Sequence, residues 1–149
     1  GRPGRCYLMA WLLDTNVLSE LRKPRPEPSV LGFIAAKPLT ELYISSVSIA
    51  EIRFGIERSP DSQKRAALQT WLDVQIRPLF DAKRTLPVTE DILVKWRLLL
   101  EDGRKIGHTF SQPDLLIAAT ALHHGLTVVS RDRSQFDKAR VTVINPWER

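Results

Sequence analysis

The feature that most constrains the fold is an alternation of short apolar segments with longer amphipathic ones. Apolar runs typical of β-strands occur at residues 10–13, 42–45, 85–88, 126–130 and 141–144. Helical patterns separate these runs, and strands that alternate with helices usually pair in parallel, because each connection crosses back over the sheet. The alternation therefore predicts a three-layer α/β/α fold, in which a short parallel sheet is flanked by helices on both faces.

The segments between the strands carry start and stop signals for helices. Helices are expected at residues 14–22, 27–36, 47–57, 61–80, 90–102 and 112–124, with a loop at 103–111 and a turn region at 131–137. Ser46 and Thr89 are expected to cap the helices that follow them. Pro78 should end or kink the long fourth helix, and Gly125 should close the last one.

The composition predicts one globular domain. The chain has 149 residues, of which 43% are hydrophobic and 26% charged, which is enough to bury a core without covalent cross-links. Residues 1–8, GRPGRCYL, do not resemble the start of a domain, whereas Met9 directly precedes the first strand. We therefore expect a non-native or disordered leader, from cloning or upstream read-through, followed by a single domain at residues 9–149. Cys6 is the single cysteine, which excludes an internal disulfide.

Charge and hydropathy indicate the cellular compartment and the kind of partner to expect. No apolar run approaches the roughly 20 residues that cross a bilayer, and residues 8–13 are too short for a signal-peptide core. A cytoplasmic protein is therefore expected. The net charge is +5, but Arg2 and Arg5 supply two of these charges, so residues 9–149 carry +3. This charge suits a phosphate-rich partner without by itself indicating nucleic acid.

Four acidic residues fall where one edge of the predicted sheet should lie. Asp14 and Asp132 follow the first and fourth strands, Asp114 is in the first turn of a helix, and Glu51 lies about one turn into another. In an open parallel sheet, the carboxyl ends of the strands and the starts of the helices share one edge, where ligands bind. The four carboxylates are therefore expected to converge.

Converging carboxylates predict a cation. Like charges within a few ångströms repel, so some of the acids would take up protons unless a metal were bound. Oxygen ligands favour Mg²⁺ or Mn²⁺, and the chain has no Cys or His cluster that would offer softer donors. Such a site lowers the pKa of bound water and neutralises charge that develops on a phosphate. The acids therefore predict metal-assisted phosphodiester hydrolysis.

Each acid taken alone has a simpler interpretation. Asp14 is equally suited to capping its helix, Asp114 to interacting with a helix dipole, and Asp132 to a turn. Glu51 lies among residues expected to pack, where an unpaired carboxylate is unfavourable, and the alternative for it is an ion pair with Arg53 or a neighbouring arginine. The joint pattern is more specific than any single residue.

Four segments also resemble a known family. LLDTNVLSEL, SVSIAEIRFGIE, PDLLIAATA and VVSRDRSQF, in this order, resemble the PIN-domain ribonucleases, and more narrowly the VapC and FitB toxins of bacterial toxin–antitoxin pairs. The closing INPW is similar to the FitB-like branch, and the resemblance runs from Met9 to the end. It implies a Mg²⁺- or Mn²⁺-dependent endoribonuclease that forms a homodimer and is inhibited by a small antitoxin protein.

The resemblance also implies roles for individual residues. By position, the family's catalytic and metal-binding acids fall on Asp14, Glu51, Asp114 and Asp132. The family tolerates Asn at the fourth position, so Asp132 is expected to reach the metal directly or through water. The supporting polar residues of the family correspond to Thr15, Asn16 and Ser130. A basic residue of the antitoxin, inserted among the acids, would displace the metal.

Several further residues have two interpretations each. Four arginines flank the predicted acidic edge, either as solvated surface or as contacts to RNA phosphates: Arg53, Arg104, Arg131 and Arg133. Three tryptophans suit core or interface packing better than base stacking: Trp71, Trp96 and Trp147. Trp11 lies in a strand that is expected to be buried. The helix at 61–80 suits either a partner groove or a dimer face.

Several alternative functions require residues or geometries that the sequence does not provide. Zinc binding by His123 and His124 would require both neighbours to face one ion, so these residues are better explained as favouring a helix C-terminus. A receiver-type phospho-switch needs an Asp after residues 42–45 and a Lys after 126–130, and both are missing. An aspartyl phosphatase needs a second Asp where Asn16 stands. A non-catalytic RNA- or protein-binding module on the same fold remains open.

Overall fold

The computed structural model describes residues 9–148, and the expected leader at residues 1–8 lies outside them. A five-stranded sheet has the order β3-β2-β1-β4-β5, and every pair of neighbouring strands is parallel, as predicted. Its strands are β1 (Trp11–Leu13), β2 (Leu42–Ser45), β3 (Thr85–Leu86), β4 (Thr127–Val129) and β5 (Val143–Ile144). The first strand in the sequence is therefore central, with β2 and β4 on either side.

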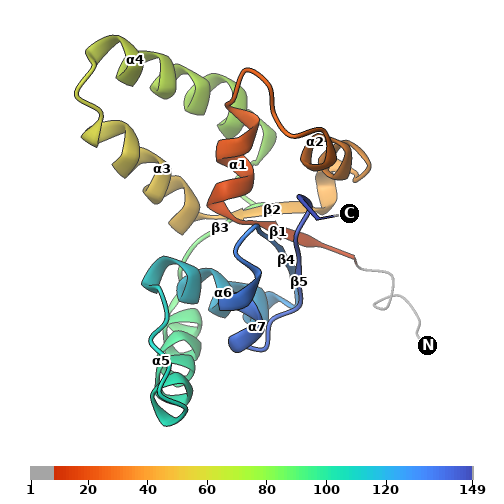
Figure 1. The fold of residues 1–149 in the computed structure, drawn as a ribbon, viewed down its shortest axis with the longest axis vertical. Coiled ribbons are helices and arrows are strands. Elements are labelled where there is room, and N and C mark those ends of the chain that lie inside the picture. The colour runs from red at the N-terminus through yellow and green to blue at the C-terminus, as the bar shows by residue number, and fades with distance from the viewer. Residues whose placement is uncertain (1–8, 149) are drawn as a thin grey trace.

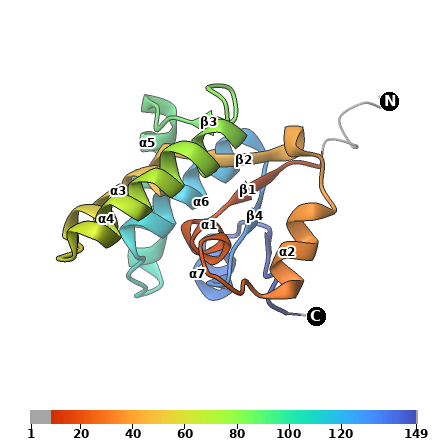
Figure 2. The same cartoon turned by 90° about the horizontal axis from the view of Figure 1, so that it is seen from above.

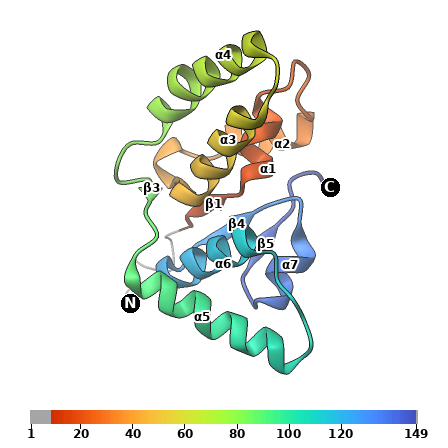
Figure 3. The same cartoon turned by 90° about the vertical axis from the view of Figure 1, so that its left-hand side faces the viewer.

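Helices cover both faces of this sheet. The α-helices are α1 (Thr15–Leu21), α2 (Pro28–Ala35), α3 (Ser46–Arg58), α4 (Ser62–Thr70), α5 (Glu90–Lys105), α6 (Gln112–His124) and α7 (Arg133–Lys138). Shorter helical segments are η2 (Leu39–Glu41), the π-helix η3 (Trp71–Ile76) and the 3₁₀ turn η4 (Arg77–Leu79). Helices α1 to α4 lie on one side of the sheet and α5 to α7 on the other (Figure 1), and a side view shows the same layers (Figure 3). The expected three-layer fold is confirmed.

The central strand β1 divides the core in two. Trp11 and Leu13 pack with the helices α1 to α4, whereas Leu12, between them, packs with α5 to α7. Successive side chains of a strand point to opposite faces, so a strand covered on both sides must be apolar at every position. All three residues are at most 5% exposed, and the burial expected for Trp11 is confirmed.

The helix ends follow most of the predicted signals. Asp61 accepts hydrogen bonds from the backbone amides of Gln63 and Lys64 at the start of α4, Thr89 caps α5, and Gly125 ends α6 with φ +69°. The cap expected at Ser46 was wrong by one residue. The Ser45 hydroxyl accepts the bond from the Val47 amide, and Ser46 is already helical.

Two segments predicted to be irregular are partly helical. The expected turn region at 131–137 contains α7, whose Phe136 is fully buried in the core beneath the sheet. The expected loop at 103–111 begins late, because α5 continues through Gly103 to Lys105. A Cβ atom at Gly103 would lie 2.7 Å from a ring carbon of Phe110. Glycine is thus kept here for close packing rather than to end the helix.

The segment predicted as one long helix at 61–80 forms α4, η3 and η4 in succession, and its helical part ends one residue after Pro78. Helices α3 and α4 form a hairpin whose arms lie side by side (Figure 2). Trp71 is buried in the core between this hairpin and the sheet. Among residues 9–148, no helix has both the length and the apolarity that a membrane span requires.

Candidate active site

The end of β1 places Asp14 at the centre of the site. Its backbone amide continues the sheet by donating to the carbonyl of Val129 (2.9 Å), and its side chain caps α1 by accepting from the amide of Thr15 (2.8 Å). The second carboxylate oxygen accepts from the hydroxyl of Ser130 (2.7 Å). Asp14 is only 3% exposed. The capping interpretation is therefore confirmed, and the same carboxylate also lines the cleft.

Ser130 forms three hydrogen bonds through one buried hydroxyl. Besides donating to Asp14, its Oγ accepts from the backbone amide of Asp132 (2.9 Å) and from the side-chain amide of Asn16 (3.3 Å). Asn16 in turn accepts from the backbone amide of Arg131 (3.3 Å). These bonds fix the loop after β4 against the start of α1, and so set the position of Asp132 relative to Asp14.

A similar bond ties α1 to α3. The Thr15 hydroxyl donates to the hydroxyl of Ser48 (3.0 Å), which is fully buried in the first turn of α3. Ser48 did not stand out in the sequence, although it lies three residues before Glu51 and therefore on the same helix face. The contact holds the Glu51 segment beside α1.

Asp114 and Asp132 form an acidic pair. Asp114 is in the first turn of α6, and its carboxyl lies within hydrogen-bonding reach of the Asp132 carboxyl. Burial, the charge of Asp14 and the contact with Asp132 raise the pKa of Asp114 to about 7. Burial also raises the pKa of Asp14, against the opposing effect of its bonds from Ser130 and Thr15. Without a cation, the cleft therefore favours protonated acids.

Glu51 differs from the sequence expectation. It is exposed on α3 rather than packed among apolar residues, so the argument from its burial was wrong. It nevertheless lines the same cleft as Asp14 and Asp114, and its charge contributes to the raised pKa of Asp14. Glu51 therefore faces the other acids across open space, where an added ion would be needed to join them.

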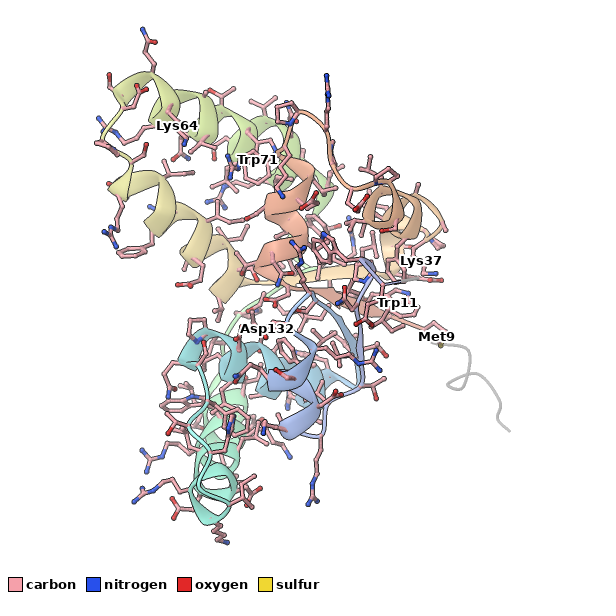
Figure 4. The ribbon with its side chains drawn as sticks, viewed as in Figure 1. Met9, Trp11, Lys37, Lys64, Trp71 and Asp132 are labelled. Carbon is pink, nitrogen blue, oxygen red and sulfur yellow. The ribbon has the colours of Figure 1, made fainter. Side chains whose placement is uncertain are left out.

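The cleft itself has a volume of about 470 Å³. Asp14, Glu51 and Asp114 line it, and Asp132 lies at the boundary between the two helical layers (Figure 4). Within residues 9–148, no three acidic, histidine or cysteine side chains already stand close enough to cage a metal ion. The acids border one cavity rather than forming a finished cluster. Their donor atoms are all oxygens, and the pKa values of Asp14 and Asp114 are raised, a combination that suits a hard divalent cation.

The basic residues divide into two groups. Arg131 lines the cleft, whereas Arg133 turns toward Asp137 and Glu148, and Arg104 lies near Glu101 on α5. Arg53 is exposed on α3 and is not among the residues that border the cleft. Of the four arginines named in the sequence analysis, only Arg131 therefore lines the cleft.

Among the cleft residues that were not predicted as part of the site are two cations and an aromatic residue: Arg22, Lys23 and Trp147. The helical spacing of the sequence could have indicated Arg22. Thr15, Ser19 and Arg22 recur at the spacing of one helix face and all line the cleft. The sequence analysis assigned Trp147 to core or interface packing and not to the site, because only the position of β5 brings this residue to the cleft.

A model of the PIN domain matches residues 11–141. The chain belongs to the PIN-domain family. This PIN domain is 39% identical to VapC ribonuclease Y4jK of Sinorhizobium fredii over 137 residues, which cover 92% of the chain and 97% of the relative. It is 37% identical to toxin FitB of Neisseria gonorrhoeae, over 91% of the chain and 97% of that protein.

Solved structures agree with this assignment. The PIN domain matches a crystal structure of FitAcB from Neisseria gonorrhoeae with a TM-score of 0.86 and 36% identity, over 93% of this chain and 99% of the other. It also matches a structure of FitAB bound to a DNA fragment, with a TM-score of 0.85 and 34% identity, over 93% and 96% of the two chains. The family resemblance seen in the four sequence segments is confirmed.

Proposed function

We propose that this PIN domain is the ribonuclease toxin of a toxin–antitoxin pair and that it cuts RNA with a bound Mg²⁺ or Mn²⁺ ion. The observation that carries the proposal is the single cleft lined by Asp14, Glu51 and Asp114, with Asp132 against Asp114. The names of the relatives, VapC ribonuclease and toxin FitB, support the RNA substrate and the toxin role.

The residues of the cleft have distinct tasks in this proposal. Asp14, Glu51 and Asp114 hold the cation, and Asp132 contacts it directly or through water. When bound, a divalent ion supplies an activated water and neutralises charge on the phosphodiester. Ser130 and the Thr15 amide hold the Asp14 carboxylate in one orientation at the wall of the cleft. Arg22 and Arg131 line the same cavity and attract the phosphate backbone.

The test is cleavage of defined RNAs by the purified protein. We expect cleavage in Mg²⁺ or Mn²⁺, none in chelator, and none by Asp14→Asn, whose fold is checked by circular dichroism. Asp102→Asn, on the exposed surface of α5, is the matched control and should cleave normally. If the wild type cut no RNA under any metal condition, a non-catalytic binding module would be the better interpretation.

We also propose where the antitoxin binds. A groove of about 470 Å³ runs along the α3–α4 hairpin and shares Thr15, Ser19, Arg22 and Glu51 with the catalytic cleft. Its apolar side chains come from both arms of the hairpin: Ile52, Ile56, Leu68 and Trp71. Its cations, beyond Arg22, are Arg58 and Lys64. The groove therefore suits an amphipathic, acidic segment, of the kind that binds a hydrophobic groove through one apolar face.

A basic residue at the end of such a segment would enter the acids and displace the cation. The measurement is co-purification and inhibition of cleavage with the cognate antitoxin. We expect Leu68→Glu to lose inhibition while retaining metal-dependent cleavage. Full inhibition of this variant would contradict the groove assignment.

Homodimerisation, which the family resemblance implies, remains part of the proposal. Helix α5 exposes Leu93, Val94 and Leu98 on one face, with exposed fractions between 43% and 57%. Light scattering of the purified protein tests the dimer, and Val94→Lys should shift it toward the monomer.

A further inference from the structure

We propose that the stacked side chains of Arg131 and Trp147 form a platform for one base of single-stranded RNA beside the scissile phosphate. The inference rests on the proposed ribonuclease function and adds how the substrate is held. The guanidinium carbon of Arg131 lies 5.1 Å from the centre of the Trp147 ring. Both residues line the cleft that contains Asp14 and Asp114. The platform and the candidate metal ligands therefore share one cavity.

The C-terminal turn is fastened in the position that this platform needs. Strand β5 ends at Ile144, and the side chain of the next residue, Asn145, forms two hydrogen bonds. Its side-chain amide nitrogen donates to the carbonyl of Arg131 (3.4 Å), and its side-chain oxygen accepts from the amide of Trp147 (2.9 Å). These bonds hold the two stacked residues together at the edge of the cleft. A surface that is ordered before binding loses little entropy when a ligand stacks on it.

Cationic side chains continue from the catalytic cleft past the platform. A neighbouring depression of about 350 Å³ shares Lys23, Arg131 and Trp147 with the cleft and extends to Arg25. Two carboxylates, Glu20 and Glu27, also line this depression, and Glu20 pairs with Lys23 (2.9 Å), so the cations exceed the acids there by one. A basic track combined with an aromatic ring is the usual arrangement for binding an unpaired nucleic-acid strand.

Stacking on Trp147 selects for single strands. In a duplex the faces of the bases are covered by their neighbours, so only an unpaired or looped strand can offer a base to an aromatic side chain. Trp147 is half-buried and lines the cleft, so the residue can be reached from the cavity. The packed part explains its contact with the core, and the accessible part explains why the cleft includes it.

Arg133 provides a matched control. It lies in the same segment as Arg131 and carries the same charge, but its guanidinium approaches Asp137 (3.7 Å) and Glu148 (3.1 Å) rather than the cleft. Arg131 and Arg133 thus differ in their surroundings, although the sequence offered the same two interpretations for both. Only Arg131 should contribute strongly to RNA binding.

The experiment is fluorescence anisotropy with a short labelled single-stranded oligoribonucleotide, in chelator so that the RNA stays intact. The proteins are the wild type, Trp147→Phe, Trp147→Leu, Arg131→Ala and Arg133→Ala, each checked by thermal unfolding. Trp147→Leu should weaken binding by about 10-fold, within the range for loss of one stacked base, and Trp147→Phe should keep most of the affinity. Arg131→Ala should lower the salt dependence of log K by about 0.7 for each lost phosphate contact, and Arg133→Ala should resemble the wild type.

Three results would overturn the platform. They are wild-type affinity in Trp147→Leu, equal losses in the Leu and Phe variants, and equally tight binding of a duplex made from the same strand. Failure of the ribonuclease proposal is read separately, from cleavage by the wild type. If the wild type cuts RNA and Trp147→Leu cuts it with unchanged KM, the platform is wrong while the ribonuclease function stands.

Discussion

Replacing Asp114 with Asn should stabilise the metal-free protein at pH 8 and remove most of the stabilisation by Mn²⁺. Burial, with the neighbouring acids, raises the pKa of Asp114 from 3.8 to about 7. The folded protein therefore binds this proton more tightly than the unfolded chain does. Between about pH 4 and pH 7 the folded state holds more protons, so its stability falls as the pH rises. Above pH 7 Asp114 is ionised in both states, and the folded state carries the full loss of stability.

The size of the effect follows from the same pKa. Each tenfold change in proton affinity corresponds to about 1.4 kcal/mol, so a fully buried carboxyl with this pKa would lose about 4 kcal/mol. Asp114 is only partly buried, and solvent screening reduces the value to about 1–2 kcal/mol. In a domain of this size, each kcal/mol moves Tm by about 2–4 °C. Asparagine keeps the shape and a hydrogen-bonding group but never ionises, so the penalty should disappear.

The assay is chemical and thermal unfolding at pH 5 and pH 8, with and without Mn²⁺. The wild type should lose stability between the two pH values in the absence of metal, and Asp114→Asn should lose less. A bound cation removes the repulsion, so Mn²⁺ at about 100 times its Kd should stabilise the wild type by about 2.7 kcal/mol, and the variant by much less. Asp102→Asn controls for a change of surface charge.

Two outcomes would refute this reasoning. One is an equal dependence of stability on pH in the wild type and in Asp114→Asn, since the raised pKa would then have no thermodynamic effect. The other is an undiminished gain from Mn²⁺ in the variant, which would place the cation away from Asp114.

Three further changes test the surroundings of the site. Ser130→Ala removes the hydroxyl that orients Asp14, and should weaken Mn²⁺ binding by about 10-fold or more in calorimetry with the fold retained. Gly103→Ala places a methyl group against the Phe110 ring and should destabilise the protein by about 1–3 kcal/mol in urea; an unchanged midpoint would contradict the close packing. Glu20→Gln should lower stability by about 1 kcal/mol at pH 7, because an ion pair and a backbone amide hold the pKa of Glu20 below its ordinary value. That contribution is lost as the pH falls through the lowered pKa, so the two proteins should become alike in acid.

Local patterns accounted for most of the elements. The apolar runs became the five parallel strands, although all of them except β2 are shorter than expected, and Thr89 and Gly125 act as the helix signals they resemble. These features depend on a few neighbouring residues, so a sequence can indicate them. The helix α7 was missed because its decisive contact is not local. Phe136 is fully buried against a core assembled from distant segments.

In the site, too, some features follow from local sequence and others from tertiary contacts. The sequence indicated the four acids and their edge of the sheet, since each follows a strand or lies in the first two turns of a helix that begins there. The exposure of Glu51, the bond from Ser130 to Asp14 and the contact of Asp114 with Asp132 depend on which strands are neighbours. Strand order places β4 beside β1, and a sequence does not state that order.

The sequence by itself therefore determined the alternating layers, the identity of the acids and the chemistry that their oxygen atoms favour. Only the tertiary structure decided which basic and aromatic side chains share their cleft. Arg131 and Trp147 are 16 residues apart in the chain but in stacking contact, because Asn145 fastens the end of β5 to the loop after β4. Contacts of this kind arise from the packing of the whole chain, and short stretches of sequence carry no sign of them.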